Sequence, residues 1–473
     1  MTIYGVKKAI GWTKNGVVLD KKFLYIRNYM KRIYENDLFT WYNSSDRKPL
    51  ILRGARQVGK STLVRLFAQN QGFDLIEINL EKKQFQSLKS EQFDIQDWII
   101  EIESIAKNKV NQKTLIFIDE IQVQVKALAM LRYFYEERKE IAIISAGSLL
   151  EIALHNEEVS FPVGRVSFMW IGPMTFGEFL IAQGSNDLYQ RILENNLLKL
   201  HHQMLLDELK KYYFVGGMPK SIKTYIETKS LIEVRSIQEE ILQTYQEDFP
   251  KYGKRINTDR LRTVFKQLAF HLGKKLIYQH LDRESKSLEI KKCIELFIKA
   301  NIIVPAYHSD ANGLPLKSQL DINIFKIYFL DIGLVNCLHE FSWDGFNKIF
   351  DETFSTKGYL AEQFVAQHLA YHLNKKAQPE LMYWLRDKNI NKAEIDFITS
   401  AQSEIFPIEV KSQSGGKLKS LKVFAEEKNQ LKAIKLSKNW FEKENLTISE
   451  NRELEVDSWP LYAIEGLIQK LKH

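Results

Sequence analysis

The sequence predicts a multidomain α/β protein, and three observations lead to this fold class. The chain has 473 residues, which is too long for one hydrophobic core of typical size. A glycine-rich loop lies between a short apolar run and an amphipathic segment, the pattern of a strand, a loop and a helix. Continuous apolar runs further along are typical of parallel strands that are buried on both faces.

The composition and the start of the chain narrow the class of protein. With 45% hydrophobic and 27% charged residues, the chain is expected to fold like an ordinary globular protein, and its net charge of +8 permits nucleic-acid binding without requiring it. Cys293 and Cys337 form no C-x-x-C pair, so we expect neither disulfides nor a zinc site. No stretch approaches 18 apolar residues, and residues 1–20 lack a continuous apolar region. We therefore expect a cytoplasmic protein.

Residues 1–45 are expected to form an N-terminal extension followed by one or two helices. Residues 1–22 are basic and poorly periodic, whereas apolar residues recur near helical spacing over 23–42. This region precedes the glycine-rich loop and suggests no chemistry of its own.

The glycine-rich loop is expected to hold the phosphates of a nucleotide. Gly54, Gly59, Lys60 and Ser61 fill the pattern G-x-x-x-x-G-K-[ST]. The glycines let backbone N–H groups converge on the phosphates, Lys60 would reach the β- and γ-phosphates, and Ser61 would bind Mg²⁺. The loop by itself does not distinguish ATP from GTP. The expected nucleotide-binding residues of this segment are Gly54, Ala55, Arg56, Gln57, Val58, Gly59, Lys60, Ser61 and Thr62.

A further expected strand, over residues 114–120, follows one expected over 74–80 and ends in two acids. Ligands of parallel α/β sheets bind at the carboxyl ends of the strands. Asp119 is therefore expected to bind Mg²⁺, and Glu120 to polarise the water that attacks the γ-phosphate. The alternative is a strand that ends in a solvated acidic turn.

Two more positions are candidates for contact with the γ-phosphate. Ser148 is at the polar end of an expected strand over 140–148 and could sense this phosphate, although Ser145 competes for the role and a plain small-residue turn is an equal alternative. Arg165 precedes an expected strand over 166–171. An arginine at the γ-phosphate accelerates hydrolysis by about 10³ to 10⁵. A surface ion pair is the alternative for Arg165, and action in cis or in trans stays open.

The segments GARQVGKS, LIFIDEIQ, SAGSLLE and PVGR, in this order and spacing, resemble an AAA+-type P-loop ATPase of a widespread prokaryotic family. The resemblance covers about residues 48–179, inside a core that we place at 46–185. It implies a five-stranded parallel sheet with helices on both faces, and ATP with Mg²⁺ at the carboxyl ends of the strands. Members of that family generally carry a C-terminal domain of unknown function.

The middle of the chain is expected to be helical and then winged-helix-like. Residues 186–250 show helical periodicity with a break at 216–219, which favours a lid over the nucleotide or a simple interdomain bundle. Over 251–340, helices followed by a hairpin around residues 312–313 are typical of a winged helix. A basic cluster at this junction could contact nucleic acid or be a solvated face; its members are Lys251, Lys254, Arg255, Arg260 and Arg262.

Residues 341–473 carry a second group of charged side chains. In the expected strands 393–398 and 404–411, alternation places Asp396, Glu409 and Lys411 opposite a face formed by Ile395, Phe397, Ile408 and Val410. Glu362 would approach from a helix over 357–372. Carboxylates bind Mg²⁺, and the metal with a lysine can activate water at a phosphodiester. The alternative is the solvated face of an amphipathic hairpin.

This second arrangement resembles the core of PD-(D/E)xK nucleases, with Asp396, Glu409-Val410-Lys411 and Glu362 as the helix acid. Ile395 stands where that core usually has proline. The resemblance implies metal binding by Asp396 and Glu409, and catalysis by Glu362, Asp396, Glu409 and Lys411. The same pattern occurs in domains that bind DNA or proteins without cutting. Lysines between residues 417 and 438 could meet nucleic-acid phosphates, or belong to a mixed solvated surface.

Together these features predict an ATP-binding and ATP-hydrolysing protein whose nucleotide state controls a C-terminal nuclease-like domain over 341–473. DNA is a more favoured nucleic-acid partner than RNA. The alternative is a nucleotide switch whose C-terminal domain is an inactive nuclease fold that binds a protein partner. The sequence leaves the oligomeric state open.

Overall fold

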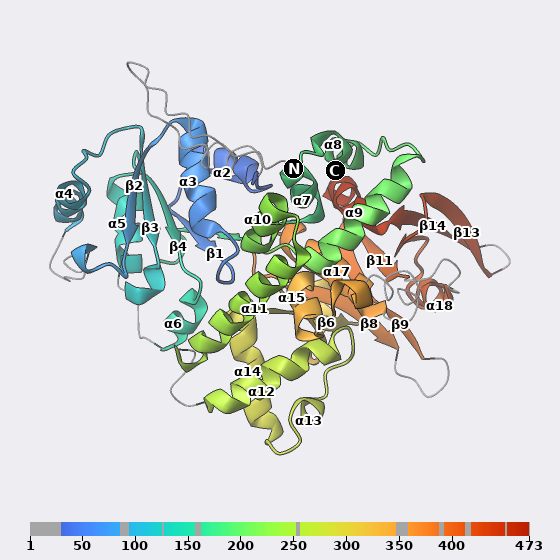
Figure 1. The fold of residues 1–473 in the computed structure, drawn as a ribbon. Coiled ribbons are helices and arrows are strands. Elements are labelled where there is room, and N and C mark those ends of the chain that lie inside the picture. The colour runs from blue at the N-terminus through green and yellow to red at the C-terminus, as the bar shows by residue number, and fades with distance from the viewer. Residues whose placement is uncertain are drawn as a thin grey trace, which may run out of the picture.

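A computed structural model describes residues 30–85, 94–124, 127–156, 162–251, 256–346, 358–386, 392–411, 418–449 and 452–472. Figure 1 shows a parallel sheet with its helices at one side of the molecule, a helical middle, and two further sheets at the other side. None of the helices in these ranges is long and apolar enough to cross a membrane.

The first sheet contains five parallel strands in the order β2-β3-β4-β1-β5. Their bounds are Leu50–Arg53 for β1, Asp74–Asn79 for β2, Thr114–Asp119 for β3, Ala142–Ala146 for β4 and Ser167–Trp170 for β5. This confirms the predicted parallel sheet. With a phosphate-type loop after β1, the arrangement is a P-loop NTPase fold.

Helices cover both faces of this sheet. Successive residues of each strand point to opposite faces, so apolar side chains on both faces need to be covered. In β3, Leu115 and Phe117 join one hydrophobic cluster, whereas Ile116 and Ile118 join another. Both faces of the sheet are therefore buried from solvent, which accounts for the continuous apolar runs in the sequence. The helices are α2 (Glu35–Tyr42), α3 (Lys60–Gln71), α4 (Ile95–Ala106), α5 (Ala127–Glu137) and α6 (Leu150–Asn156).

The middle of the chain begins with five helices, and four of them lie within residues 186–250, where the periodicity predicts helices. They are α7 (Phe176–Ala182), α8 (Asn186–Leu193), α9 (His201–Val215), α10 (Pro219–Thr228) and α11 (Leu231–Asp248). The break at 216–219 separates α9 from α10: Gly216 has a φ of 75°, and Pro219 occupies the first turn of α10. Proline fits there because its missing N–H would have no partner inside the helix.

The expected winged-helix-like region has helices followed by a hairpin, but the hairpin belongs to a larger sheet. β6 pairs antiparallel with β7 and parallel with β8, in a four-stranded sheet of order β7-β6-β8-β9. The hairpin therefore joins the middle of the chain to the C-terminal region. The elements are α12 (Thr258–Leu268), α13 (Tyr278–Leu281), α14 (Ser287–Lys299), β6 (Ile303–Ser309), β7 (Leu320–Phe329) and α15 (Ile332–Leu338).

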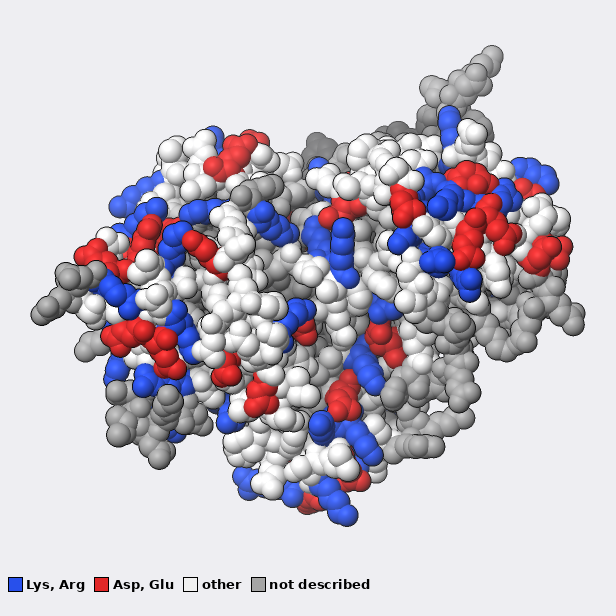
Figure 2. Space-filling model, turned by 180° about the vertical axis from the view of Figure 1, so that it is seen from behind, with Lys and Arg blue, Asp and Glu red and all other residues white. Residues whose placement is uncertain are grey.

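The basic cluster at this junction is paired with acids where the structure describes it. Lys251 lies 2.9 Å from Asp248, and Arg260 lies 3.2 Å from Glu289. Arg262 pairs with Asp259, whereas Lys254 and Arg255 fall outside the described ranges. Basic and acidic side chains are also interspersed over the face seen in Figure 2.

The C-terminal region adds a sheet of order β10-β11-β12-β14-β13. β10 and β11 are antiparallel, and β12 lies parallel to both β11 and β14. The elements are α17 (Gly358–His372), β8 (Leu381–Arg386), β9 (Ala393–Ile395), β10 (Phe397–Ala401), β11 (Glu404–Val410), α18 (Lys419–Lys428), β12 (Lys432–Ser437), β13 (Glu442–Ser449), β14 (Arg452–Pro460) and α19 (Ile464–Lys472). Short 3₁₀ turns occur at Lys83–Phe85, Ile121–Gln124, Phe249–Lys251, Ala269–His271, Leu316–Gln319 and Leu461–Ala463.

The expected strand over 393–398 is divided at Asp396. β9 pairs with β8 in one sheet and β10 pairs with β11 in the other, so the chain changes sheets at this residue. As a result, Ile395 packs in one hydrophobic cluster, whereas Phe397 and Ile408 pack in another. The expectation that Ile395 shares a face with Phe397 is wrong, because the alternation does not continue across a change of sheet.

Candidate nucleotide site and C-terminal acidic site

The loop between β1 and α3 has a backbone shape that its glycines permit. Gly54 has a φ of 132°, and a Cβ built there would lie 2.1 Å from the carbonyl oxygen of Ile171. Gly59 has a φ of 92° and immediately precedes α3. Gln57 also has a positive φ, of 62°. This left-handed backbone and the close approach to the chain after β5 explain the two glycines.

Lys60 fills the inside of the loop. Its Nζ donates hydrogen bonds to the carbonyls of Gly54, at 2.9 Å, and Ala55, at 2.7 Å. Burial lowers the pKa of Lys60 to about 8, against the opposing charges of Glu120 and Asp119. The ammonium thus lies inside the phosphate loop. Oxygens of a bound phosphate chain would be stronger hydrogen-bond acceptors for it than the two carbonyls are.

Ser61 and Asp119 bring together a hydroxyl and a carboxylate from two different elements. Ser61 Oγ donates to Asp119 Oδ2 at 2.7 Å, and the Glu120 amide donates to Asp119 Oδ1 at 3.0 Å. Burial raises the pKa of Asp119. Hard oxygen donors of this kind suit Mg²⁺, so Ser61 and Asp119 are the residues that would hold it. When bound, the ion would neutralise charge on the phosphate oxygens.

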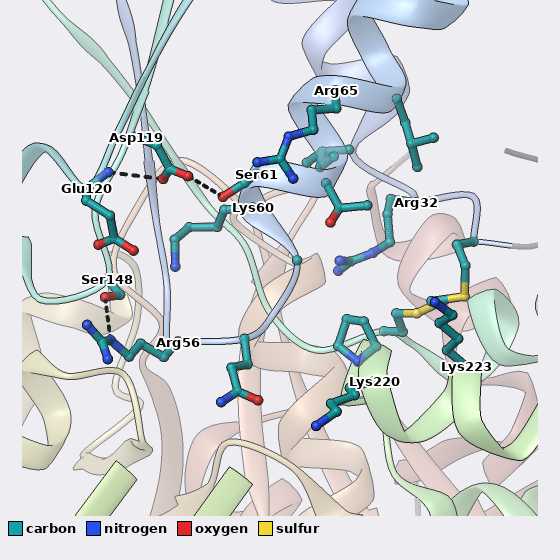
Figure 3. Close-up of a pocket in the computed structure, with 18 residues that line it drawn as sticks. Arg32, Arg56, Lys60, Ser61, Arg65, Asp119, Glu120, Ser148, Lys220 and Lys223 are labelled. Carbon is teal, nitrogen blue, oxygen red and sulfur yellow. Dashed lines mark hydrogen bonds between the residues drawn. The ribbon is translucent and has the colours of Figure 1, made fainter. Parts of the chain in front are cut away.

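Glu120 follows β3 in a left-handed backbone conformation, with a φ of 55°. Its Oε2 accepts a hydrogen bond from the side-chain amide of Gln122, which orients the carboxylate. Non-glycine residues with positive φ are uncommon and often mark functional positions. The carboxylate lies on the wall of the cavity beside Lys60 (Figure 3).

These residues surround a cavity of about 490 Å³. Figure 3 shows Asp119, Glu120, Ser148 and Arg56 on one side of it and Arg32, Lys220 and Lys223 on the other. The last two come from α10, so the helical region contributes to the cavity wall. The lining residues are Met30, Arg32, Arg56, Gln57, Gly59, Lys60, Ser61, Thr62, Leu63, Arg65, Leu66, Asp119, Glu120, Ser148, Met174, Pro219, Lys220 and Lys223.

The two candidate serines and Arg165 lie in different surroundings. Ser148 lines the cavity and accepts a hydrogen bond from Arg56 Nε at 3.4 Å, whereas Ser145 is fully buried in β4 and absent from the lining. Arg165 is an exposed side chain whose Nε donates to Glu136 at 2.8 Å. The structure therefore brings Ser148 to the cavity but leaves Arg165 on the surface of the same chain.

Arg32 is a part of the site that sequence reasoning missed. Its guanidinium donates to the carbonyls of Val58 and Gly172, both at 2.8 Å, and pairs with Glu178 at 3.0 Å. Arg32 and Glu178 are both buried. The arginine thus fixes the phosphate loop against the segment after β5. It stands in the stretch over 23–42 that the sequence predicted to be helical, where its charge belongs to no motif that points to a site.

The second predicted group of acids also comes together. Glu409 forms an ion pair with Lys411, and Asp396 Oδ2 accepts a hydrogen bond from the Val410 amide at 2.7 Å. Burial, and next the charge of Asp396, raise the pKa values of Glu362 and of Glu409 to about 8 in each case. Asp396 is therefore close enough for its charge to act on both glutamates, one from α17 and one from β11.

Lys326 of β7 is a further member of this group. The side chain is 1% exposed, forms an ion pair with Glu394 and lies 3.9 Å from Glu362 Oε2. The Tyr328 hydroxyl donates to the same oxygen at 3.0 Å. The sequence held a signal, because Lys326 is the one charged residue in the run IFKIYF. We call Lys326, Glu362, Asp396, Glu409 and Lys411 the C-terminal acidic site.

The donors for a metal in the C-terminal acidic site are few. Glu409 Oε2 is buried without a hydrogen-bond partner and lies in the same group as Asp396. Within the part of the chain that the structure describes, no group of three or more His, Cys, Asp or Glu side chains is arranged to hold a metal ion. The protein side chains thus supply at most a partial ligand set here.

Three family models match successive parts of the chain. Residues 46–180 match an AAA domain, residues 206–345 match a domain of unknown function (DUF8612), and residues 357–460 match another domain of unknown function (DUF4143). No curated protein matches the sequence.

Solved structures resemble parts of the chain at low identity. Caenorhabditis elegans PCH-2 is 16% identical with a TM-score of 0.25, and the match covers 45% of this chain and 63% of PCH-2. The Thermotoga maritima RuvB Holliday junction branch migration motor is 12% identical with a TM-score of 0.29, covering 59% and 93%. The Aeropyrum pernix ORC1 protein, solved in complex with DNA, is 10% identical with a TM-score of 0.26, covering 68% and 93%.

The fold and the family match agree for the first part of the chain. The match to the AAA model covers residues 46–180. This range contains the parallel sheet, the loop around Lys60, and the acids at the end of β3. Residues 46–180 are therefore an AAA-type domain of a multidomain α/β chain.

Proposed function

We propose that the chain binds and hydrolyses ATP, with Mg²⁺, in its AAA-type domain. The observation that carries this proposal is the convergence of Lys60, Ser61, Asp119 and Glu120 on one cavity of about 490 Å³. A cation for the phosphates, two oxygen donors for Mg²⁺ and a carboxylate for the attacking water are the components that phosphoryl transfer needs.

Each residue has one role in the proposed reaction. Lys60 exchanges its two carbonyl acceptors for oxygens of the β- and γ-phosphates. Glu120 orients the attacking water and polarises it. Ser148 lies on the same wall, where its hydroxyl can donate to a γ-phosphate oxygen. The loop from Gly54 to Thr62 surrounds the phosphates with backbone N–H groups.

We further propose that the nucleotide state controls the C-terminal acidic site. A continuous series of contacts supports this coupling. Pro219 lines the nucleotide cavity, and Gly217, two residues before it, donates to Asp331 at 2.5 Å. Asp331 lies two residues after the end of β7, the strand that carries Lys326 and Tyr328, and the Tyr328 hydroxyl donates to Glu362. A movement of the turn before α10 would therefore reach the acidic group through β7.

The C-terminal acidic site is proposed to cleave nucleic acid, with DNA favoured over RNA. Asp396 and Glu409 would bind a divalent ion, Glu362 and Lys411 would act beside them, and the remaining ligands would come from water and the phosphodiester. The support is the gathering of these side chains at the meeting point of α17, β7 and β11.

A second function is favoured by one specific observation. Lys326 and Lys411 already form ion pairs with Glu394 and Glu409. A charge group that is compensated inside the protein suits a domain that uses a nuclease-like fold to bind a protein partner. In this alternative the chain is a nucleotide switch without cleavage.

ATP turnover tests the first part of the proposal. We expect purified protein with Mg²⁺ to release phosphate from ATP and Lys60→Ala to lose at least about 10²-fold in rate, because the phosphates lose their buried cation. Lys139→Ala is the matched control, since Lys139 is a half-exposed lysine of the same domain that lies 3.6 Å from Asp46. Turnover that survives Lys60→Ala would remove the assignment of this site.

Cleavage assays separate the two C-terminal functions. Single-stranded DNA, double-stranded DNA and RNA are incubated with Mg²⁺ or Mn²⁺, with and without ATP. We expect nicking that Asp396→Ala abolishes and that depends on nucleotide. Products that are equal for wild type and Asp396→Ala, or absent for both, would leave the protein-binding alternative.

A further inference from the structure

Arg56 is the third residue of the phosphate loop and lies on the wall of the nucleotide cavity. Its Nη1 donates to Asp248 Oδ1 at 3.0 Å and lies 2.8 Å from Oδ2, while Nε donates to Ser148 at 3.4 Å. Its carbonyl accepts a hydrogen bond from the Tyr245 hydroxyl at 2.8 Å. Asp248 and Tyr245 belong to α11, so Arg56 ties the loop to the end of that helix.

The guanidinium of Arg56 lies among the groups that would surround a γ-phosphate. Its positive charge acts on Lys60, where it adds to the effect of burial in lowering the pKa of the lysine. Figure 3 shows Arg56 and Ser148 together below Glu120, on the same side of the cavity as Lys60. Two cations beside the catalytic carboxylate form a position suited to a highly charged anion.

The other arginines with a connection to this site are less suited to meet the phosphate. Of the three arginines in the cavity lining, Arg32 is engaged by the loop carbonyl of Val58 and by the buried Glu178. Arg65 forks across Glu77 with distances of 2.8 and 2.6 Å. Arg165 pairs with Glu136 away from the cavity lining. If Arg32 broke these contacts to reach a phosphate, the phosphate loop would lose its attachment to the segment after β5.

Asp248 can lose its contact with Arg56 because a second cation lies beside it. Its side chain is 4% exposed, and a carboxylate left there without a cation would be unfavourable. However, Lys251 also lies 2.9 Å from Asp248 Oδ1. If Arg56 moves away, Lys251 still compensates the charge, so the exchange leaves no uncompensated buried carboxylate.

We propose that Arg56 is the catalytic arginine of this ATPase site and acts in cis, exchanging Asp248 for the γ-phosphate of bound ATP. The inference rests on the proposed ATP hydrolysis. Water oxygen bonds to the γ-phosphorus and passes one proton to Glu120, while the bond from phosphorus to the β–γ bridging oxygen breaks and its electron pair stays on ADP; the products are ADP and phosphate. Arg56 neutralises charge on the γ-phosphoryl oxygens and exchanges no proton. After phosphate leaves, Arg56 returns to Asp248, so hydrolysis reports to the end of α11.

Nucleotide discrimination tests the exchange. Dissociation constants for Mg²⁺–AMP-PNP and Mg²⁺–ADP are measured by calorimetry. We expect Arg56→Ala to raise the dissociation constant for AMP-PNP at least about tenfold and that for ADP less than about threefold, since only AMP-PNP carries a γ-phosphate. Asp248→Asn should tighten the binding of AMP-PNP relative to that of ADP, because Arg56 then breaks no ion pair when it moves to the γ-phosphate. The double variant should match Arg56→Ala.

Hydrolysis rates complete the test. We expect kcat to fall about 10³-fold in Arg56→Ala, the lower end of the range for arginines at this position. Arg138→Ala is the matched control, because Arg138 forms a surface pair with Glu140 in the same domain. Thermal melts, and Arg56→Lys as a charge-retaining variant, exclude unfolding as the cause. A purely structural Arg56 would weaken both nucleotides equally, or leave kcat within about threefold of wild type; either result overturns the inference.

Loss of the ATPase site and loss of the role of Arg56 alone would give different results. If wild type neither binds nor hydrolyses ATP, the proposed function fails and with it the role of Arg56. If wild type hydrolyses ATP, Lys60→Ala does not, and Arg56→Ala behaves like wild type, only the assignment of Arg56 fails. A kcat per subunit that is constant over protein concentration is expected for an arginine in cis; a rate that rises with concentration argues for one supplied in trans.

Discussion

The amide of Gly217 donates a 2.5 Å hydrogen bond to the carboxylate of Asp331, across 114 residues of sequence. Asp331 also accepts from Leu334 at the start of α15, and burial raises its pKa to about 6. Gly216 and Gly333 pack closely at this contact, where a Cβ on Gly333 would lie 2.7 Å from the Cα of Gly216. The turn before α10 and the end of β7 are thus one packed unit between the two candidate sites.

Replacing Asp331 by alanine is expected to lower the free energy of unfolding by about 2–4 kcal/mol, because a helix cap is lost and the buried Gly217 amide loses its acceptor. Urea denaturation measures this change. The exposed Asp310→Ala should stay within about 0.5 kcal/mol of wild type. A loss for Asp331→Ala no larger than for Asp310→Ala would show that the contact does not hold the two segments together.

The same contact provides a test of coupling. Asp331→Asn keeps an acceptor for Gly217 but removes the negative charge. We expect its ATP turnover to stay within about fivefold of wild type while the ATP dependence of C-terminal activity or partner binding weakens. Comparing these two readouts in one variant distinguishes coupling from damage to the ATPase site.

Gly54→Ala should prevent formation of the phosphate loop, because its Cβ would lie 2.1 Å from the Ile171 carbonyl and its φ is 132°. We expect a destabilisation of at least about 3 kcal/mol and no ATP binding, measured by thermal melting and calorimetry. Gly184→Ala is the control. Gly184 has a φ of 86° but nothing within 4 Å, so only a backbone cost of about 1 kcal/mol is expected. Equal effects of the two substitutions would contradict the steric argument.

Much of the first domain could be predicted because its signals are local. The loop from Gly54 to Ser61 and the acids after β3 each lie in a short motif, and parallel strands bring their carboxyl ends to one edge of a sheet. The hydrogen bond between Ser61 and Asp119 at 2.7 Å follows from this geometry. Local alternation also predicted that Glu409 and Lys411 lie on the same side of the chain, and the two form an ion pair at the end of β11.

Contacts that depend on how distant elements pack could not be predicted. Arg56 and Asp248 are 192 residues apart and meet only because α11 lies against the phosphate loop. Lys326 reaches Glu362 because β7 and α17 pack together. At Asp396, strand periodicity failed because the chain passes from one sheet into another. In each case tertiary packing decided the outcome, and no short segment of sequence contains that information.

Glu120→Gln is expected to separate nucleotide binding from hydrolysis. Glutamine keeps the size of the side chain but cannot polarise water as a carboxylate does, so kcat should fall by about 10²- to 10³-fold. The dissociation constant for Mg²⁺–AMP-PNP should remain within about threefold of wild type, because Lys60 and Ser61 are unchanged. Glu137→Gln, at the end of α5 in the same domain, is the control. Full turnover in Glu120→Gln would place the water-activating group elsewhere.

Glu362→Gln tests the electrostatics of the C-terminal acidic site through pH. Burial and the charge of Asp396 raise the pKa of Glu362 from 4.5 to about 8, against Lys326 and the Tyr328 hydroxyl, with Glu394 adding to the rise. The folded state therefore binds this proton more tightly than the unfolded state does. Its stabilising contribution is complete below about pH 4.5 and is lost as the pH rises through about 8.

Glutamine removes this titration and keeps an oxygen to accept the Tyr328 hydrogen bond. With EDTA present, we expect unfolding free energies within about 0.5 kcal/mol of wild type at pH 5 and about 1–3 kcal/mol higher than wild type at pH 9. Glu442→Gln, on the exposed edge of β13, controls for the loss of one negative charge. Urea denaturation over this pH range gives both curves. Curves for Glu362→Gln and wild type that run parallel from pH 5 to 9 would show that Glu362 is already ionised at pH 5, and that Lys326 compensates its burial.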